Sequence, residues 1–224
     1  MTKGKGIFLI VLGLIFIAAA LLLVLYNVNE DNHASEAAKG ALTQLQALIP
    51  TRPDTSSPES TDASDEAVPP EDPPLGNTGE IEIPDYQLNP EMDMPEKTVD
   101  GHNYIGIIEI PTLNISLPVI SRWSDEALTV APCRYSGSVY TDDLVIAGHN
   151  YRSHFGKLSR INTGDKVYFT DIDSNVFEYE AVVIETLHST AVEEMKSGEW
   201  DLSLFTCTLG GGSRTTVRLN KTEK

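Results

Sequence analysis

An uncharged apolar stretch near the N-terminus limits what this 224-residue chain can fold into. Residues 6–26 read GIFLIVLGLIFIAAALLLVLY. A helix of about 20 apolar residues is long enough to cross the hydrocarbon core of a bilayer. The sequence therefore predicts a transmembrane signal anchor over residues 7–26. A cleaved signal peptide is the alternative, since the alanines at 18–20 resemble a cleavage site, but further apolar residues follow them.

The charges that flank this stretch indicate its orientation. Lys3 and Lys5 precede it, whereas the first charges after it are Glu30 and Asp31. Because positive flanks stay on the cytoplasmic side, we expect a single-pass protein of the cell membrane, with residues 1–6 cytoplasmic and the rest of the chain extracellular. The formal net charge of −17 argues against nucleic acid as a partner.

The region between the apolar stretch and the first strand-like run has three parts. Residues 27–49 are rich in Ala, Leu, Gln and Glu at near-helical spacing, which predicts a juxtamembrane helix. Residues 50–80 combine Pro, Ser, Asp and Glu, a mixture that cannot bury enough apolar surface to fold. We expect a disordered acidic stalk there, which sets the reach of the following domain. Residues 81–103 form a lead-in to that domain.

Short strand-like runs fill residues 104–224, the predicted folded domain. Several of them alternate apolar and polar side chains, as a half-buried strand does. The runs are YIGIIEI, ISLPVI, DLVIAGH, KVYFTD, VFEYEAVVIETL, WDLSLFTC and TTVRLN. Since only one short helix is expected among them, over residues 189–198, this pattern predicts a mostly β domain that forms a closed or nearly closed barrel.

One of the five histidines has the sequence context of a reactive side chain. His149 follows a buried-looking strand in LVIAGHN, where Gly148 lets the backbone turn and present the next side chain at the rim of the sheet. His154 follows in a polar loop and is a weaker candidate. The other three fit surface or structural positions better: His33, His102 and His188.

Cys207 also stands at a strand end, before a glycine-rich turn. A cysteine attacks as the thiolate, so it needs a lowered pKa or a neighbouring acid or base. A hairpin closed by residues 209–213 would bring Arg214 back beside it, where a permanent cation can stabilise a thiolate or an oxyanion. Arg218, farther along the same face, is the reserve candidate. The alternatives are an inert buried cysteine and a disulfide with Cys133.

Metal and cofactor sites have little support in the sequence. The chain contains no Cys-x-x-Cys and no His-x-x-x-His spacing of the kind that binds zinc. TDIDSN at residues 170–175 has two aspartates but lacks a complete calcium loop. We therefore expect no cofactor and no metal, although the sequence does not decide calcium dependence.

Several separate segments of the chain resemble motifs of the sortases and occur in the same order as in that family. Sortases are membrane-anchored cysteine transpeptidases of Gram-positive bacteria. The histidine element AGHN is followed by FGKLSRINTGDKVYF, which is similar to the family's Phe-Gly, Leu and Gly-Asp spacing. SLFTC is similar to its Thr-Leu-x-Thr-Cys signature, with Ser203 in place of Thr, and an arginine follows on the next strand. APCRYSGS resembles its turn before the histidine strand, although glycine more often stands at Cys133. The resemblance covers residues 104–220.

The resemblance implies a closed eight-stranded β-barrel with one or two short helices. It also implies Cys207 as nucleophile, His149 as general acid and base, and Arg214 as the residue that stabilises the oxyanion or the substrate. The substrate would be a surface protein with a C-terminal sorting signal like Leu-Pro-x-Thr-Gly, cleaved after Thr to give a thioester that an amine resolves. We then expect Cys133 and Cys207 not to be disulfide-bonded, since the bond would consume the nucleophile.

The resemblance implies one of two acceptor amines. A peptidoglycan precursor supplies the amine in sortases that anchor surface proteins to the cell wall, and a pilin lysine supplies it in sortases that polymerise pili. We expect anchoring, because the sequence shows no lid resembling Asp-Pro-Trp ahead of the barrel. The alternatives are a pilin-polymerising sortase, a hydrolytic cysteine peptidase, and a non-catalytic exported β-barrel that binds the cell wall.

Overall fold

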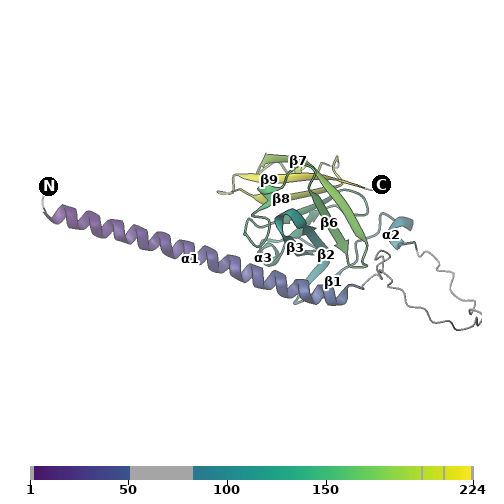
Figure 1. Ribbon diagram of the computed structural model, residues 1–224, viewed down its shortest axis with the longest axis horizontal. Helices are drawn as coiled ribbons and strands as arrows, with labels where there is room; N and C mark the ends of the chain where they lie inside the picture. Colours follow the sequence, from purple (N-terminus) through teal and green to yellow (C-terminus); the bar gives the residue numbers. More distant parts are fainter. Residues whose placement is uncertain (1–2, 51–82, 198, 209, 223–224) are drawn as a thin grey trace, which may run out of the picture.

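The computed structural model describes residues 3–50, 83–197, 199–208 and 210–222. The predicted acidic stalk, apart from Pro50, lies outside these residues. The described part consists of one long helix, α1, and a β-barrel with short helices in its connections (Figure 1).

Eight strands close into the barrel, as predicted. Around the barrel their order is β2, β3, β4, β5, β8, β9, β7 and β6, and the pairing of β6 with β2 completes the circle. Two neighbouring pairs are parallel, β3 with β4 and β5 with β8. A short strand, β1, pairs with β2 outside the circle. The bounds are β1 (Lys97–Val99), β2 (His102–Ile110), β3 (Ile115–Ile120), β4 (Cys133–Ser136), β5 (Leu144–Gly148), β6 (Lys166–Asp171), β7 (Val176–His188), β8 (Leu202–Cys207) and β9 (Ser213–Lys221).

Alternate strand positions fill the barrel interior. In β6, with the sequence KVYFTD, the second, fourth and sixth residues are buried, because successive strand side chains point to opposite faces. The first half of β7 alternates in the same way. β5, with the sequence LVIAG, is buried at every position, which accounts for its apolar and small residues. This buried strand leads directly to His149.

Short helices occupy the connections. α4 (Val192–Met195) lies inside the range expected for a helix. α3 (Asp125–Val130) was not expected; it begins after Ser124, whose hydroxyl accepts a hydrogen bond from the backbone N–H of Ala127 at 3.0 Å, as an N-cap serine does. The other helical segments are too short to leave a periodic pattern in the sequence: α2 (Asp85–Leu88), η1 (Pro111–Leu113) and η2 (Leu158–Arg160).

The apolar stretch and the segment after it form one continuous helix, α1 (Lys3–Leu48). Within the described residues it is the one helix long and apolar enough to cross a membrane. Figure 1 shows its N-terminal half extending away from the barrel and its C-terminal end running along the barrel, next to α3 and β1. Four residues on one face of this end are buried, at spacings of three and four: Ala34, Ala38, Ala41 and Leu45.

Residues on both sides of the acidic segment pack against the barrel. Ile49, just before it, packs against a cluster that includes barrel residues, and Tyr86, shortly after it, packs against the main core. Both flanks of residues 50–80 thus contact the barrel, and α1 joins the apolar stretch to the barrel without a break. The expectation that residues 50–80 set the reach of the domain concerns residues that, apart from Pro50, lie outside the described ones.

Candidate active site

Cys207 is the last residue of β8, at the edge of the barrel where β9 returns. Its Cα pairs with that of Arg214 in the antiparallel ladder, so the expected hairpin is confirmed. In the turn, Gly210 and Gly211 have φ angles of 91° and 74°, a region that glycine adopts without strain. Backbone pairing alone therefore places a thiol next to a permanent cation.

His149 follows β5, which runs parallel to β8. The last paired positions of the two strands are Gly148 and Thr206, so His149 and Cys207 are the next residues along, at the same end of neighbouring strands. Such strands lie about 4.8 Å apart. Gly148 is needed here for a close approach rather than for the turn we expected, because a Cβ on it would lie 2.3 Å from the ring of Phe155.

Neighbouring side chains fix the orientation of the His149 ring. The ring stacks on that of Tyr151, with centroids 3.9 Å apart and planes 5° apart. Its Nδ1 lies 3.1 Å from Oδ1 of Asn150. The His149 side chain lines a cavity that is walled on its other side by residues 24–31 of α1. The backbone thus brings His149 to the edge that holds Cys207, and the residue borders the cavity next to α1 rather than the pocket lined by Cys207.

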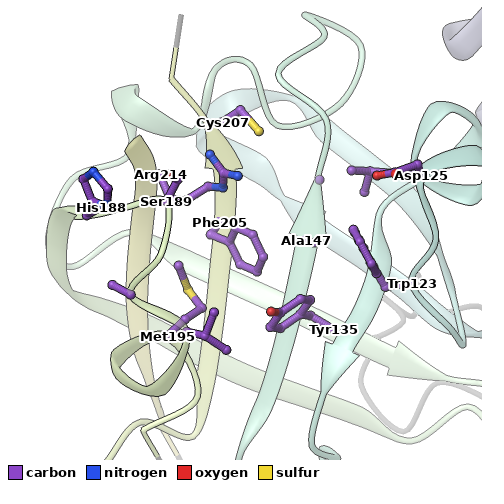
Figure 2. A pocket seen from close by; sticks show the side chains of 14 residues that line it. Trp123, Asp125, Tyr135, Ala147, His188, Ser189, Met195, Phe205, Cys207 and Arg214 are labelled. Carbon is purple, nitrogen blue, oxygen red and sulfur yellow. The ribbon is translucent and has the colours of Figure 1, made fainter. Parts of the chain in front are cut away.

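A pocket of about 280 Å³ opens next to Cys207 (Figure 2). Its walls are largely aromatic and apolar. The rings of Tyr135 and Phe205 meet edge to face with centroids 5.3 Å apart, and Trp123 stands against Tyr135 at 6.0 Å. Figure 2 shows the Arg214 guanidinium beside the thiol, with these rings farther along the pocket. The pocket is thus a largely apolar cleft that opens at the thiol.

The two candidate arginines of β9 occupy different environments. Arg214 lines the pocket, and its Nη1 donates to the carbonyl oxygens of Gly211 and Ser213 at 2.9 and 3.1 Å. Arg218 is 2% exposed and forms an ion pair with Glu185 at 2.8 Å. It also donates to two backbone carbonyls at the end of α4. Arg218, the reserve candidate, therefore belongs to the core, and Arg214 is the arginine next to the thiol.

A family model described as Sortase domain matches residues 108–220, half of the chain. The chain belongs to the sortase family. Sortase A of Bacillus anthracis is 25% identical over 137 residues, which cover 57% of this chain and 65% of that protein. The structure of sortase A from Corynebacterium diphtheriae matches with a TM-score of 0.50 and 22% identity, over 55% of this chain and 62% of that one. The chain thus spans just under two thirds of the length of these two relatives.

In this sortase the second candidate histidine and the second cysteine are buried. His154 is 0% exposed, and burial, followed by the nearby His149, lowers its pKa to about 4. Cys133 is also 0% exposed, and burial raises the pKa of its thiol to about 12. Both cysteines are free thiols. Of the described cysteines, Cys207 is therefore the accessible one.

Sequence reasoning missed most of the pocket wall of this sortase. His188, which we placed among the surface or structural histidines, lines the pocket at the end of β7, where its Nδ1 lies 2.8 Å from the hydroxyl oxygen of Thr190. Trp123 and Tyr135 come from the two sides of α3, far from Cys207 in the chain. The one usable signal was Trp123 itself, an aromatic residue within the polar segment SRWSDE.

The aspartates considered for calcium form part of a turn. Asp171 is buried, and its carboxylate accepts hydrogen bonds from the Tyr140 hydroxyl, from the backbone N–H groups of Asp173 and Asn175, and from the Asn175 amide. Across the part of the chain that the structure describes, no group of three or more histidine, cysteine or acidic side chains is arranged to hold a metal ion.

Proposed function

We propose that this sortase is a cysteine transpeptidase of the cell surface. It cleaves a sorting signal like Leu-Pro-x-Thr-Gly after the threonine and joins the released protein to an amine of the cell wall. The observation that best supports this function is the meeting of Cys207, Arg214 and the strand end that carries His149 at one edge of the barrel, next to an apolar pocket.

The first half-reaction forms a thioester. The Cys207 thiolate attacks the threonine carbonyl, and the Arg214 guanidinium stabilises the oxyanion of the tetrahedral intermediate. As the C–N bond breaks, the protonated His149 imidazole donates its proton to the leaving amino group of glycine. The products are an acyl-enzyme at Cys207 and a peptide with a free N-terminus.

The second half-reaction uses the same groups with a different amine. Neutral His149 accepts a proton from the incoming amine as it attacks the thioester carbonyl. The new amide bond forms and the Cys207 thiolate leaves. One imidazole serves both steps because it donates a proton when protonated and accepts one when neutral. We assign the acceptor to a peptidoglycan precursor, so the product is a surface protein anchored to the cell wall.

The chemistry of the pocket supports a substrate of this kind. Leucine and proline side chains are apolar, and they can bury surface against Tyr135, Phe205 and Met195. Phe205 and Cys207 are two residues apart on β8, so their side chains lie on the same face of the strand. A peptide bound along that face leads to the thiol.

The helix α1 supports a location at the membrane. Residues 7–26 would cross the cell membrane once, with the N-terminus in the cytoplasm and the barrel outside the cell, as the flanking Lys3 and Lys5 predict. Surface proteins exported across the same membrane would then meet the barrel on its outer side.

The test uses the full-length chain in detergent micelles, a Leu-Pro-x-Thr-Gly peptide, and triglycine as the amine. We expect cleavage between Thr and Gly, with faster turnover and a ligated product when triglycine is present. Cys207→Ala should abolish cleavage, whereas Cys133→Ser, which removes the buried thiol, should retain it. Cleavage by Cys207→Ala would refute the proposal, and turnover that does not respond to the amine would identify a hydrolytic peptidase instead.

A further inference from the structure

The helix α1 contacts the loop that carries His149. Asp31 on α1 accepts two hydrogen bonds on Oδ1, from the Ser153 hydroxyl at 2.7 Å and from the Ser153 backbone N–H at 3.1 Å. The two residues are 122 positions apart in the sequence. Hydrogen bonds to a carboxylate are stronger than those between neutral groups, and a bond to the backbone N–H fixes the chain as well as the side chain.

The loop connects this contact to His149 through its own hydrogen bonds. The carbonyl of Tyr151 accepts from the backbone N–H of Gly156 at 2.8 Å, and the carbonyl of His149 accepts from that of Phe155 at 3.1 Å. The Tyr151 ring in turn stacks on the imidazole. Ser153 lies inside this turn, so a contact that holds Ser153 also holds the ring against which His149 packs.

Burial of His154 shows how closely α1 covers the loop. This side chain is 0% exposed. Ala34 on α1 and Val130 at the end of α3 lie near it, as does the charge of Asp31. The helix is therefore packed against the loop as an element of the domain.

From these contacts we propose that α1 positions His149 for catalysis and that Asp31 is the positioning residue. The inference rests on the proposed function, in which His149 is the general acid and base. Asp31 acts through Ser153 and Tyr151. The helix that would anchor this sortase in the membrane is thus also a support of its active site, and a barrel separated from α1 would have a less ordered histidine loop.

The same contact fixes where the active site lies. Asp31 follows Tyr26, the end of the predicted span, by five residues, which is about 8 Å along a helix that rises 1.5 Å per residue. Residues 24–31 line the same cavity as His149 and Arg152. A catalytic edge held this close to the span meets its substrates at the membrane surface.

The kinetic test compares three variants of the full-length chain in lipid nanodiscs: Asp31→Ala, Asp31→Asn and the matched control Gln44→Ala. Gln44 also joins α1 to the barrel, by donating to Asp100 at 2.8 Å, but near the C-terminal end of the helix. We expect Asp31→Ala to lower kcat about tenfold with little change in KM, because a misplaced catalytic group costs rate more than binding. Asp31→Asn should keep most of the rate, since its amide oxygen can accept the same hydrogen bonds, and Gln44→Ala should match the wild type.

Hydrogen exchange provides a second readout that does not require activity. The amide hydrogens of residues 149–156 should exchange faster in Asp31→Ala than in Gln44→Ala. If the wild-type chain cleaves no sorting peptide, the proposed function fails, and the exchange comparison alone decides whether Asp31 holds the loop. Equal kcat, or equal exchange, in Asp31→Ala and Gln44→Ala would overturn the positioning role.

Discussion

The two halves of the candidate active site are held in place by different means. Cys207 and Arg214 are seven residues apart and are joined by the β8–β9 ladder, so backbone pairing brings them together. The strand β5 places His149 at the same edge. The orientation of its ring depends on Tyr151 and, through Ser153, on Asp31 of α1, which is 122 residues from Ser153 in the sequence. The strand half should therefore tolerate changes outside the barrel, whereas the histidine half should respond to changes in α1.

For the residues that support each half, this difference separates a loss of stability in the whole domain from a local loosening of one loop. A ladder of backbone hydrogen bonds forms together with the barrel, so side chains that support β8 and β9 should affect the stability of the whole domain. The histidine loop is held by a few side-chain contacts, so a single substitution can loosen it while the barrel stays folded. Substitutions on the two sides of the active edge should therefore give different signatures.

The largest expected effect is on the strand half and concerns stability. Arg218 donates to Glu185, to Ser203 and to the carbonyls of Glu194 and Met195. Arg218→Met should lower the free energy of unfolding by about 3–5 kcal/mol, because it leaves buried acceptors without a donor. Urea denaturation in micelles measures the loss. Glu185→Gln, which keeps an acceptor for the guanidinium at a partly exposed position, should cost less, about 1–2 kcal/mol. Equal losses in the two variants would contradict the role of Arg218 as a buried donor.

The histidine half should make stability depend on pH. Burial, and to a lesser extent His149, lowers the pKa of His154 from 6.5 to about 4, while Asp31 opposes the shift. The unfolded chain therefore binds more protons between these values, and the free energy of unfolding falls by about 3 kcal/mol as the pH drops through this window. His154→Phe should flatten this dependence. His33→Gln, at an exposed position on α1, should leave the pH dependence unchanged. If His154→Phe also leaves it unchanged, His154 is not the buried neutral histidine that causes it.

A smaller effect, on rate, is expected from Arg214→Lys. Lysine keeps the positive charge but loses the planar set of donors, so kcat for peptide cleavage should fall about 100-fold, or about 2.7 kcal/mol, with a smaller change in KM. Steady-state kinetics of the full-length chain measures both. Arg160→Lys, at an exposed position in η2, is the control and should match the wild type. If Arg214→Lys has the kcat of the wild type, the guanidinium is not required for catalysis.

The smallest effect should come from Cys133→Ser. Cys133 is fully buried, and its Sγ lies 3.3 Å from the carbonyl oxygen of Ala131, a partner that a serine hydroxyl can also reach. We expect turnover within about twofold of the wild type and a loss of about 1 kcal/mol in stability. Loss of activity comparable to that of Cys207→Ala would show that the two cysteines have been assigned the wrong way round.

The contrast between the two halves also explains what the sequence could predict. The barrel and the pairing of Cys207 with Arg214 follow from local patterns, namely alternating strands and a glycine turn between them. The contact of Asp31 with Ser153 could not be predicted, because neither residue belongs to a periodic pattern or a motif. Nothing in the sequence around one of them indicates that it contacts the other. The helical spacing of residues 27–49 was visible, yet the face formed by Ala34 and Ala38 did not say what it packs against.

The pocket wall was hidden for a similar reason. Tyr135, Phe205 and Met195 are ordinary apolar residues in their own segments, and only closure of the barrel gathers them around one cavity. The orientation of the His149 ring likewise depends on its stacking on Tyr151. The spacing of these two residues in the sequence does not predict that geometry.

Trapping the acyl-enzyme tests directly whether Cys207 is the nucleophile. The full-length chain is mixed with a Leu-Pro-x-Thr-Gly peptide in the absence of an amine, quenched in acid, digested and analysed by mass spectrometry. We expect the peptide up to its threonine to be attached to the fragment that contains Cys207, and addition of triglycine before quenching to remove it. An adduct on the fragment that contains Cys133, or cleavage with no adduct at Cys207, would contradict the role of Cys207 as the nucleophile.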